Sequence, residues 1–166
     1  MDETTLDAVR GQFGASLDSL GLAMDACPPA LWNDRASGQA FGDHVFHVLF
    51  WLDFYLAESP ATFAPPAPFG VEEMDPAGVL PPQVHAPDAL HGYLAHVRAR
   101  VRAALAAFAA DPAAAAEVKH LGNTDLSALE WLLYNLRHVQ HHVGQLQMLL
   151  RQHGVEPPRW VRRGAD

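Results

Sequence analysis

The sequence has little cysteine, little positive charge and no long apolar run. Cys27 is the single cysteine, so no disulfide can form within the chain, and we expect a reducing, cytoplasmic setting. Lysine and arginine total 11 against 19 aspartates and glutamates, and the net charge of -8 disfavours nucleic acid or an anionic membrane as the main partner. No apolar run reaches the roughly 18 residues of a membrane-spanning helix, and we expect no signal peptide.

Several catalytic motifs are missing as well. The sequence contains no glycine-rich phosphate loop and no His-Glu-x-x-His protease motif. Glu117 and His120 form a Glu-x-x-His pair, but a di-iron bundle needs such a pair on each of two helices. These absences disfavour nucleotide chemistry, zinc proteases of that type and di-iron proteins.

What the sequence does have is helical periodicity. Apolar residues recur at three- and four-residue steps in four long segments, and no segment shows the alternation of a strand. Ser37 and Ser127 are the expected N-caps of the second and fourth helices, and Arg98, Arg100 and Arg102 of the third are expected to reach solvent. The four predicted helices span residues 5–25, 37–58, 87–110 and 127–154. We therefore predict an all-α four-helix bundle of the up-down-down-up type.

Proline marks the connection between the second and third helices. Eight of the 13 prolines lie between Pro60 and Pro87, which excludes a regular helix and favours a long crossover over the surface. Apolar side chains in this crossover predict that part of it docks on the bundle and forms part of a pocket rim: Phe63, Phe69, Val71 and Met74. We assign residues 1–156 to one domain and residues 157–166 to a basic C-terminal tail.

Ten histidines are many for this length, and two of them share a helix face. His138 and His142 are four residues apart, a spacing that lets two imidazoles bind one metal ion. Arg137, Gly144 and Arg151 repeat every seven residues and mark the expected solvent face, so the two histidines point inward. Inward imidazoles need partners, because an unpaired buried polar group is costly.

A third ligand is expected from the second helix, which offers His44 and His47. His47 lies in the middle of that helix among aromatic residues, which favours it, with His44 as the alternative and Asp43 as a hydrogen-bond partner one turn away. Three neutral nitrogens leave an open position on a divalent ion, as in catalytic rather than structural sites. Imidazole ligands suit zinc, nickel, copper and iron.

Two pieces of sequence also resemble a known family. His47-Val48-Leu49-Phe50-Trp51 and Asn135-Leu136-Arg137-His138-Val139-Gln140-His141-His142-Val143-Gly144-Gln145-Leu146 resemble the DinB/YfiT-like metal-binding four-helix bundles. The resemblance implies a three-histidine site formed by His47, His138 and His142. It also implies a divalent cation (zinc first, with nickel or iron as alternatives), homodimers, and low-molecular-weight thiols such as bacillithiol or mycothiol as cosubstrates.

Together these observations predict a metal-dependent enzyme, a thiol transferase that acts on small electrophiles. The alternatives are a metal-dependent hydrolase and a non-catalytic stress-response protein that binds a metal or a small ligand. Four further residues are candidates for proton transfer or for support of the ligands: Asp43, His44, Tyr134 and Asn135.

Overall fold

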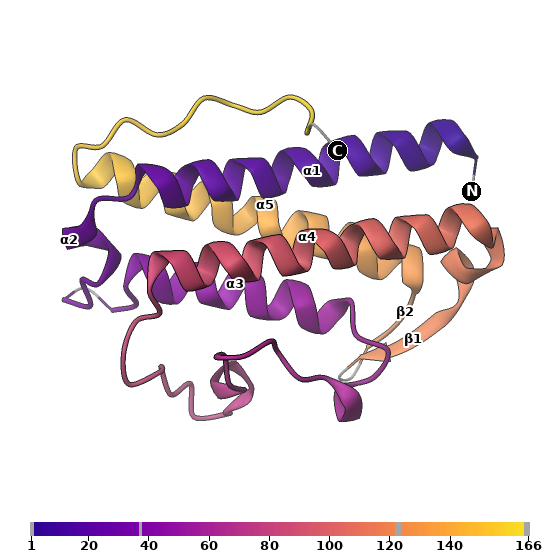
Figure 1. The fold of residues 1–166 in the computed structure, drawn as a ribbon, viewed down its shortest axis with the longest axis horizontal. Helices are drawn as coiled ribbons and strands as arrows, with labels where there is room; N and C mark the ends of the chain where they lie inside the picture. Colours follow the sequence, from indigo (N-terminus) through magenta and orange to yellow (C-terminus); the bar gives the residue numbers. More distant parts are fainter. Residues whose placement is uncertain (1, 37, 122–123, 165–166) are drawn as a thin grey trace.

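The computed structural model describes residues 2–36, 38–121 and 124–164. In these residues the chain is mostly helical, as predicted, with one small sheet (Figure 1). The α-helices are α1 (Glu3–Ala26), α2 (Pro29–Trp32), α3 (Phe41–Tyr55), α4 (Pro87–Ala110) and α5 (Ala128–Gln152). The strands are β1 (Val118–Leu121) and β2 (Thr124–Ser127), and three short 3-10 helices are η1 (Pro60–Thr62), η2 (Glu72–Met74) and η3 (Pro112–Ala116).

The four long helices pack side by side around one apolar core. Helix α1 packs against α4 and α5, and α3 packs against the same two helices (Figure 1). Phe13 and Leu20 of α1 and Leu49 of α3 are among the side chains that solvent does not reach. No helix of the described residues is both long and apolar enough to cross a membrane.

Helix α5 begins with the cap that the sequence predicts. The Ser127 hydroxyl accepts a hydrogen bond from the Glu130 backbone N–H at 3.2 Å, and the Glu130 carboxylate accepts one from the Ser127 N–H at 3.0 Å. The helix ends before Gly154, whose φ of 74° lies in the left-handed region that glycine adopts without strain. These two hydrogen bonds fix the residue at which α5, the helix that carries His138 and His142, begins.

Helix α3 begins later than expected. The expected N-cap, Ser37, lies outside the described residues, and the helix starts at Phe41 with Ala40 in the cap position. The carboxylate of Asp43, in the third position of the helix, accepts a hydrogen bond from the N–H of the cap residue Ala40 at 3.0 Å. Helix α3 is buried on most of its circumference, as its aromatic content predicted.

The proline-rich crossover between α3 and α4 docks on the bundle at two aromatic residues. Phe69 is buried and stacks on Tyr93 with ring centres 4.5 Å apart, and Phe63 meets Phe50 edge-on at 5.2 Å. Val71 and Met74, which were also expected to dock, remain exposed. Two aromatic anchors thus hold the crossover against α3 and α4.

The expectation of no strand was wrong. Strands β1 and β2 form an antiparallel hairpin in which Val118 pairs with Ser127 and Leu121 with Thr124. Gly122 and Asn123, which connect the two strands, lie outside the described residues. The hairpin is short and largely exposed, so its residues do not alternate between apolar and polar as strands on a core do.

Arg100 corrects a second expectation, because it turns inward instead of reaching solvent. Its guanidinium pairs with the fully buried carboxylate of Asp53 and donates to the Leu56 carbonyl at 2.8 Å. The Tyr93 hydroxyl donates to the same carboxylate at 3.1 Å. These bonds join the end of α3 to α4.

The segment after α5 folds back along α1 (Figure 1). The Gly164 N–H donates to the Gly11 carbonyl at 2.8 Å, and the Arg163 guanidinium lies 2.7 Å from the Asp7 carboxylate. Of the basic residues in the expected tail, Arg163 therefore contacts α1 through its side chain.

Candidate metal centre

Helices α3 and α5 bring three histidines together. His47 lies in the middle of α3, and His138 and His142 lie one turn apart on the facing side of α5. One ligand nitrogen from each lies within 4.8 Å of the others. Among the residues that the structure describes, this is the only group of three or more histidine, cysteine or acidic side chains spaced to hold an ion.

Burial favours the neutral form of His138 and His142. Burial, together with the charges that neighbouring histidines would carry, lowers the pKa of His138 to about 3 and that of His142 to about 4. A neutral imidazole has a free lone pair on one nitrogen, which is the form that binds a metal. Both rings are therefore in the binding form at neutral pH.

His138 shows why an ion fits this cluster. Its Nδ1 is buried, and no hydrogen-bond partner for it lies in the described part of the chain. Buried polar atoms in folded proteins nearly always have a partner, so this nitrogen indicates a missing one. The donor set of three imidazoles suits zinc and other divalent transition metals.

His44, the alternative third ligand, has a different place. Its Nε2 lies 2.7 Å from Nδ1 of His142, and burial lowers its pKa to about 4. The hydrogen bond occupies one nitrogen of His142 and leaves the other for an ion. His44 thus lies behind the three-histidine cluster and orients one of its rings.

Glu73 orients the ring of His47 in the same way, a contact that the sequence did not predict. One oxygen of its carboxylate lies 2.7 Å from Nδ1 of His47 and accepts a hydrogen bond from Nε1 of Trp51 at 2.9 Å. Glu73 comes from η2 in the crossover, 26 residues away from His47 in sequence. The expectation that the crossover lies beside a site was the one signal that could have led to it.

Asp43, expected to support His47, is engaged elsewhere. Its two oxygens accept hydrogen bonds from the Arg35 guanidinium, both at 2.7 Å, in addition to the one from Ala40. Arg35 also donates to the Pro81 carbonyl at 2.9 Å. Asp43 therefore ties the start of α3 to the crossover, and the carboxylate beside His47 is that of Glu73.

Asn135 and Tyr134, the other two candidate residues, lie in different environments. Asn135 is fully buried, and its amide donates to the Leu52 carbonyl at 2.9 Å, which joins α5 to α3. Tyr134 is partly exposed and meets the ring of Tyr55 edge-on at 5.1 Å. Of the two, Tyr134 lines a cavity next to the histidines.

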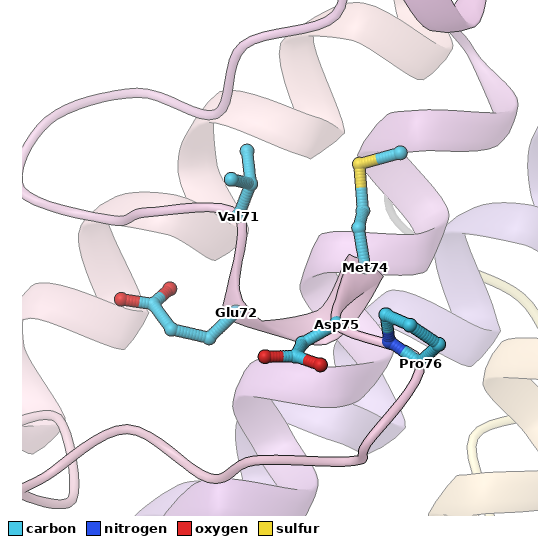
Figure 2. Close-up of a pocket in the computed structure, with 5 residues that line it drawn as sticks. All are labelled: Val71, Glu72, Met74, Asp75 and Pro76. Atoms are coloured by element: carbon cyan, nitrogen blue, oxygen red, sulfur yellow. The ribbon is translucent and has the colours of Figure 1, made fainter.

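That cavity has a volume of about 290 Å³ and opens onto the cluster at His138. Its lining residues are Tyr134, Arg137, His138 and His141. A larger hollow of about 510 Å³ lies on the crossover itself, and Figure 2 shows the side chains that line it: Val71, Glu72, Met74, Asp75 and Pro76. No histidine lines the second hollow, so a small molecule would reach the cluster through the first.

The other histidines and the cysteine lie outside the cluster. His91, His96 and His120 each lie within 4.0 Å of an aspartate oxygen, and His153 bonds to the Leu149 carbonyl. Burial raises the pKa of the Cys27 thiol to about 12, which leaves it un-ionised and fits a structural role.

Comparison with known proteins agrees with this geometry. No curated protein matches the chain in sequence. The model of the DinB superfamily matches residues 5–146, which include the three clustered histidines and all four long helices apart from the first two residues of α1 and the end of α5. The chain belongs to the DinB superfamily.

Proposed function

We propose that this protein is a divalent-metal-dependent enzyme, a thiol transferase that acts on small electrophilic molecules. The observation that carries the proposal is the cluster of His47, His138 and His142, whose ligand nitrogens lie within 4.8 Å of one another beside an open cavity. The DinB-like family is metal-binding, which supports an ion at this cluster. Zinc is the proposed ion, with nickel or iron as alternatives.

The chain would hold the ion through these three imidazoles. When bound, an ion with an open position lowers the pKa of a water or thiol beside it and so supplies a nucleophile near neutral pH. Glu73 and His44 hold the rings of His47 and His142 through their other nitrogens. A low-molecular-weight thiol is the proposed cosubstrate.

Aromatic side chains shield one side of the cluster. The ring of Tyr55 stacks on Trp131 with centres 5.2 Å apart and meets His138 edge-on at 5.9 Å. Trp131 is almost completely buried. These rings cover part of the His138 imidazole, and shielding it from water strengthens electrostatic interactions within the site.

The cavity lining favours thiol transfer over hydrolysis. Hydrolysis at a metal site commonly uses a carboxylate as general base for the attacking water. In the described part of the chain no carboxylate lines the cavity, and that of Glu73 is engaged by His47 and Trp51. A thiol has an unperturbed pKa of about 8.5, far below that of water, so it can release its proton to solvent when it meets the ion and depends less on such a base. A hydrolase is therefore the second candidate.

We further infer the setting in which this site works. The proposed topology is the up-down-down-up bundle, with residues 1–156 as its domain and a homodimer as its assembly. The proposed partner is a small-molecule substrate in the cytoplasm.

The first test is the metal content of protein made without a histidine tag or added metal. We expect about one equivalent in the parent and little in His47→Ala and His138→Ala, whereas His153→Ala, which alters a histidine outside the cluster, keeps its ion. Thiol-transfer assays with bacillithiol or mycothiol and a panel of electrophiles follow. A parent that holds no metal and gains no thermal stability from zinc or nickel overturns the proposal. A metal-loaded but inactive protein would instead indicate the non-catalytic stress-response role.

A further inference from the structure

The cavity beside the three-histidine cluster has an unusual charge. Arg137, His138 and His141 follow Tyr134 by three, four and seven residues, so the four side chains lie along one face of α5. Although the chain carries a net charge of -8, no acidic side chain of the described residues lines this cavity. Its surface offers one permanent cation, two imidazoles and a phenol.

Arg137 is the residue that gives this surface its positive charge. In the described part of the chain its guanidinium makes no ion pair, whereas those of Arg35, Arg98 and Arg100 each pair with an aspartate. The guanidinium lies over the Tyr134 ring, 5.9 Å from its centre. This contact restrains the side chain while its N–H groups remain free to bind a planar oxyanion.

The adjoining cluster adds charge of the same sign once an ion is bound. The three imidazoles are neutral ligands, so they do not offset a divalent ion, and Glu73 supplies a single negative charge beside His47. A neutral or cationic ligand would leave this excess uncompensated. An anionic ligand would be favoured by both Arg137 and the ion.

We propose that the cavity binds the acidic end of a small ligand, an oxyanion held by Arg137, while the other end of the same ligand reaches the ion at the cluster. The proposal rests on the proposed function and narrows its thiol cosubstrate to one that carries an acid group. The volume of about 290 Å³ is close to the lower end of the range for small-molecule sites, roughly 300–1,000 Å³.

The test compares two thiols on protein loaded with cobalt(II), whose visible absorption changes when a thiol joins the metal. 2-Mercaptoethanesulfonate and 2-mercaptoethanol have the same two-carbon chain and differ in the acid group, and a sulfonate is a poor metal ligand. We expect the parent to bind the sulfonate about tenfold more tightly, as one charge-assisted contact gives. The preference should shrink as salt is added, because the contact is electrostatic.

Two variants separate Arg137 from general surface charge. Arg137→Gln should lose the preference for the sulfonate and keep its affinity for 2-mercaptoethanol. Arg151→Gln removes the same charge from the exposed face of α5 about four turns further along the helix, and it should keep the preference. Cobalt content and the thiol-free spectrum of each variant show whether the cluster itself is intact.

The outcomes distinguish this inference from the proposed function. A parent that takes up no cobalt overturns both. A parent that takes up cobalt but binds neither thiol, or shows no preference between them, overturns the inference and leaves the metal site standing. The inference also fails if Arg151→Gln loses the preference as Arg137→Gln does.

Discussion

Glu73 and His47 are joined by a hydrogen bond of 2.7 Å between a carboxylate oxygen and Nδ1 of the imidazole. An ionised carboxylate only accepts hydrogen bonds, so this bond places a proton on Nδ1, and in a neutral ring Nε2 then keeps the lone pair that a metal needs. The bond reaches from the crossover to the middle of α3. The position of the crossover on the bundle therefore determines which nitrogen of His47, a proposed ligand, carries the proton.

The first prediction concerns this carboxylate. Glu73→Ala should weaken zinc binding about 10- to 100-fold, because His47 loses the group that fixes its tautomer and ring orientation. Competition with a chromogenic chelator measures the affinity. Asp75→Asn is the matched control, since it removes a charge from the same segment where the carboxylate bonds to the Ala77 N–H. Equal affinities for Glu73→Ala and the control would show that the bond does not support the site.

The second prediction concerns the pH dependence of stability in metal-free protein. The folded-state pKa values of His44, His138 and His142 are about 4, 3 and 4, and the unfolded values are near 6.5. Between these limits the unfolded chain binds more protons than the folded one. Stability should therefore be complete above pH 6.5 and fall as the pH drops towards 4.

Thermal unfolding of chelator-treated protein between pH 7 and 4 checks this dependence. His138→Gln should show a shallower fall in melting temperature over the same range, because one of the three protons is no longer taken up. His153→Gln, which alters an exposed histidine, should follow the parent. An unchanged slope in His138→Gln would mean that other groups govern the acid sensitivity.

Local pattern was enough to predict the four long helices, apart from the two ends of α3, and the inward histidines. Proline at the start and Asp111-Pro112 at the end define α4, which spans Pro87–Ala110 as predicted. The four-residue step between His138 and His142, together with the solvent face marked by Arg137 and Arg151, predicted which face of α5 points inward. Each of these inferences depends on neighbours within a few residues.

The features that the sequence did not predict are long-range. Glu73 meets His47 only because Phe63 and Phe69 hold the crossover in place, and no local signal in an acidic 3-10 turn indicates that contact. Arg100 turns inward because Asp53, 47 residues earlier, is buried beneath it. A charged residue at an apparently exposed helix position has its partner on another element, and the periodicity of one helix carries no information about it.

The third prediction tests that buried carboxylate. Tyr93→Phe removes one hydrogen bond to Asp53 and should lower the free energy of unfolding by about 1 kcal/mol. Asp53→Asn should cost more, about 3 kcal/mol, because the guanidinium of Arg100 then faces a neutral amide. Urea unfolding measures both. The reverse order would mean that Arg100 is adequately solvated without the carboxylate.

The fourth prediction concerns the segment that folds back on α1. A Cβ atom at Gly164 would lie 2.4 Å from the Gly14 carbonyl carbon, so Gly164→Ala should push the segment away from the helix. Limited trypsin digestion should then cut faster after Arg159 and Arg162, while metal content stays at the parent value. Gly92→Ala, where a Cβ meets nothing within 4 Å, should leave the cleavage rate unchanged.

The indole of Trp51 gives the site an optical reporter of its own. Its N–H bonds to Glu73, and its ring centre lies 6.4 Å from that of His47. Any event that rotates the imidazole or lifts η2 changes the polarity around this fluorophore, so emission should respond both to metal loading and to release of the crossover. In a variant with phenylalanine at Trp32, Trp131 and Trp160, a stopped-flow trace would record the two events as separate phases or as a single one.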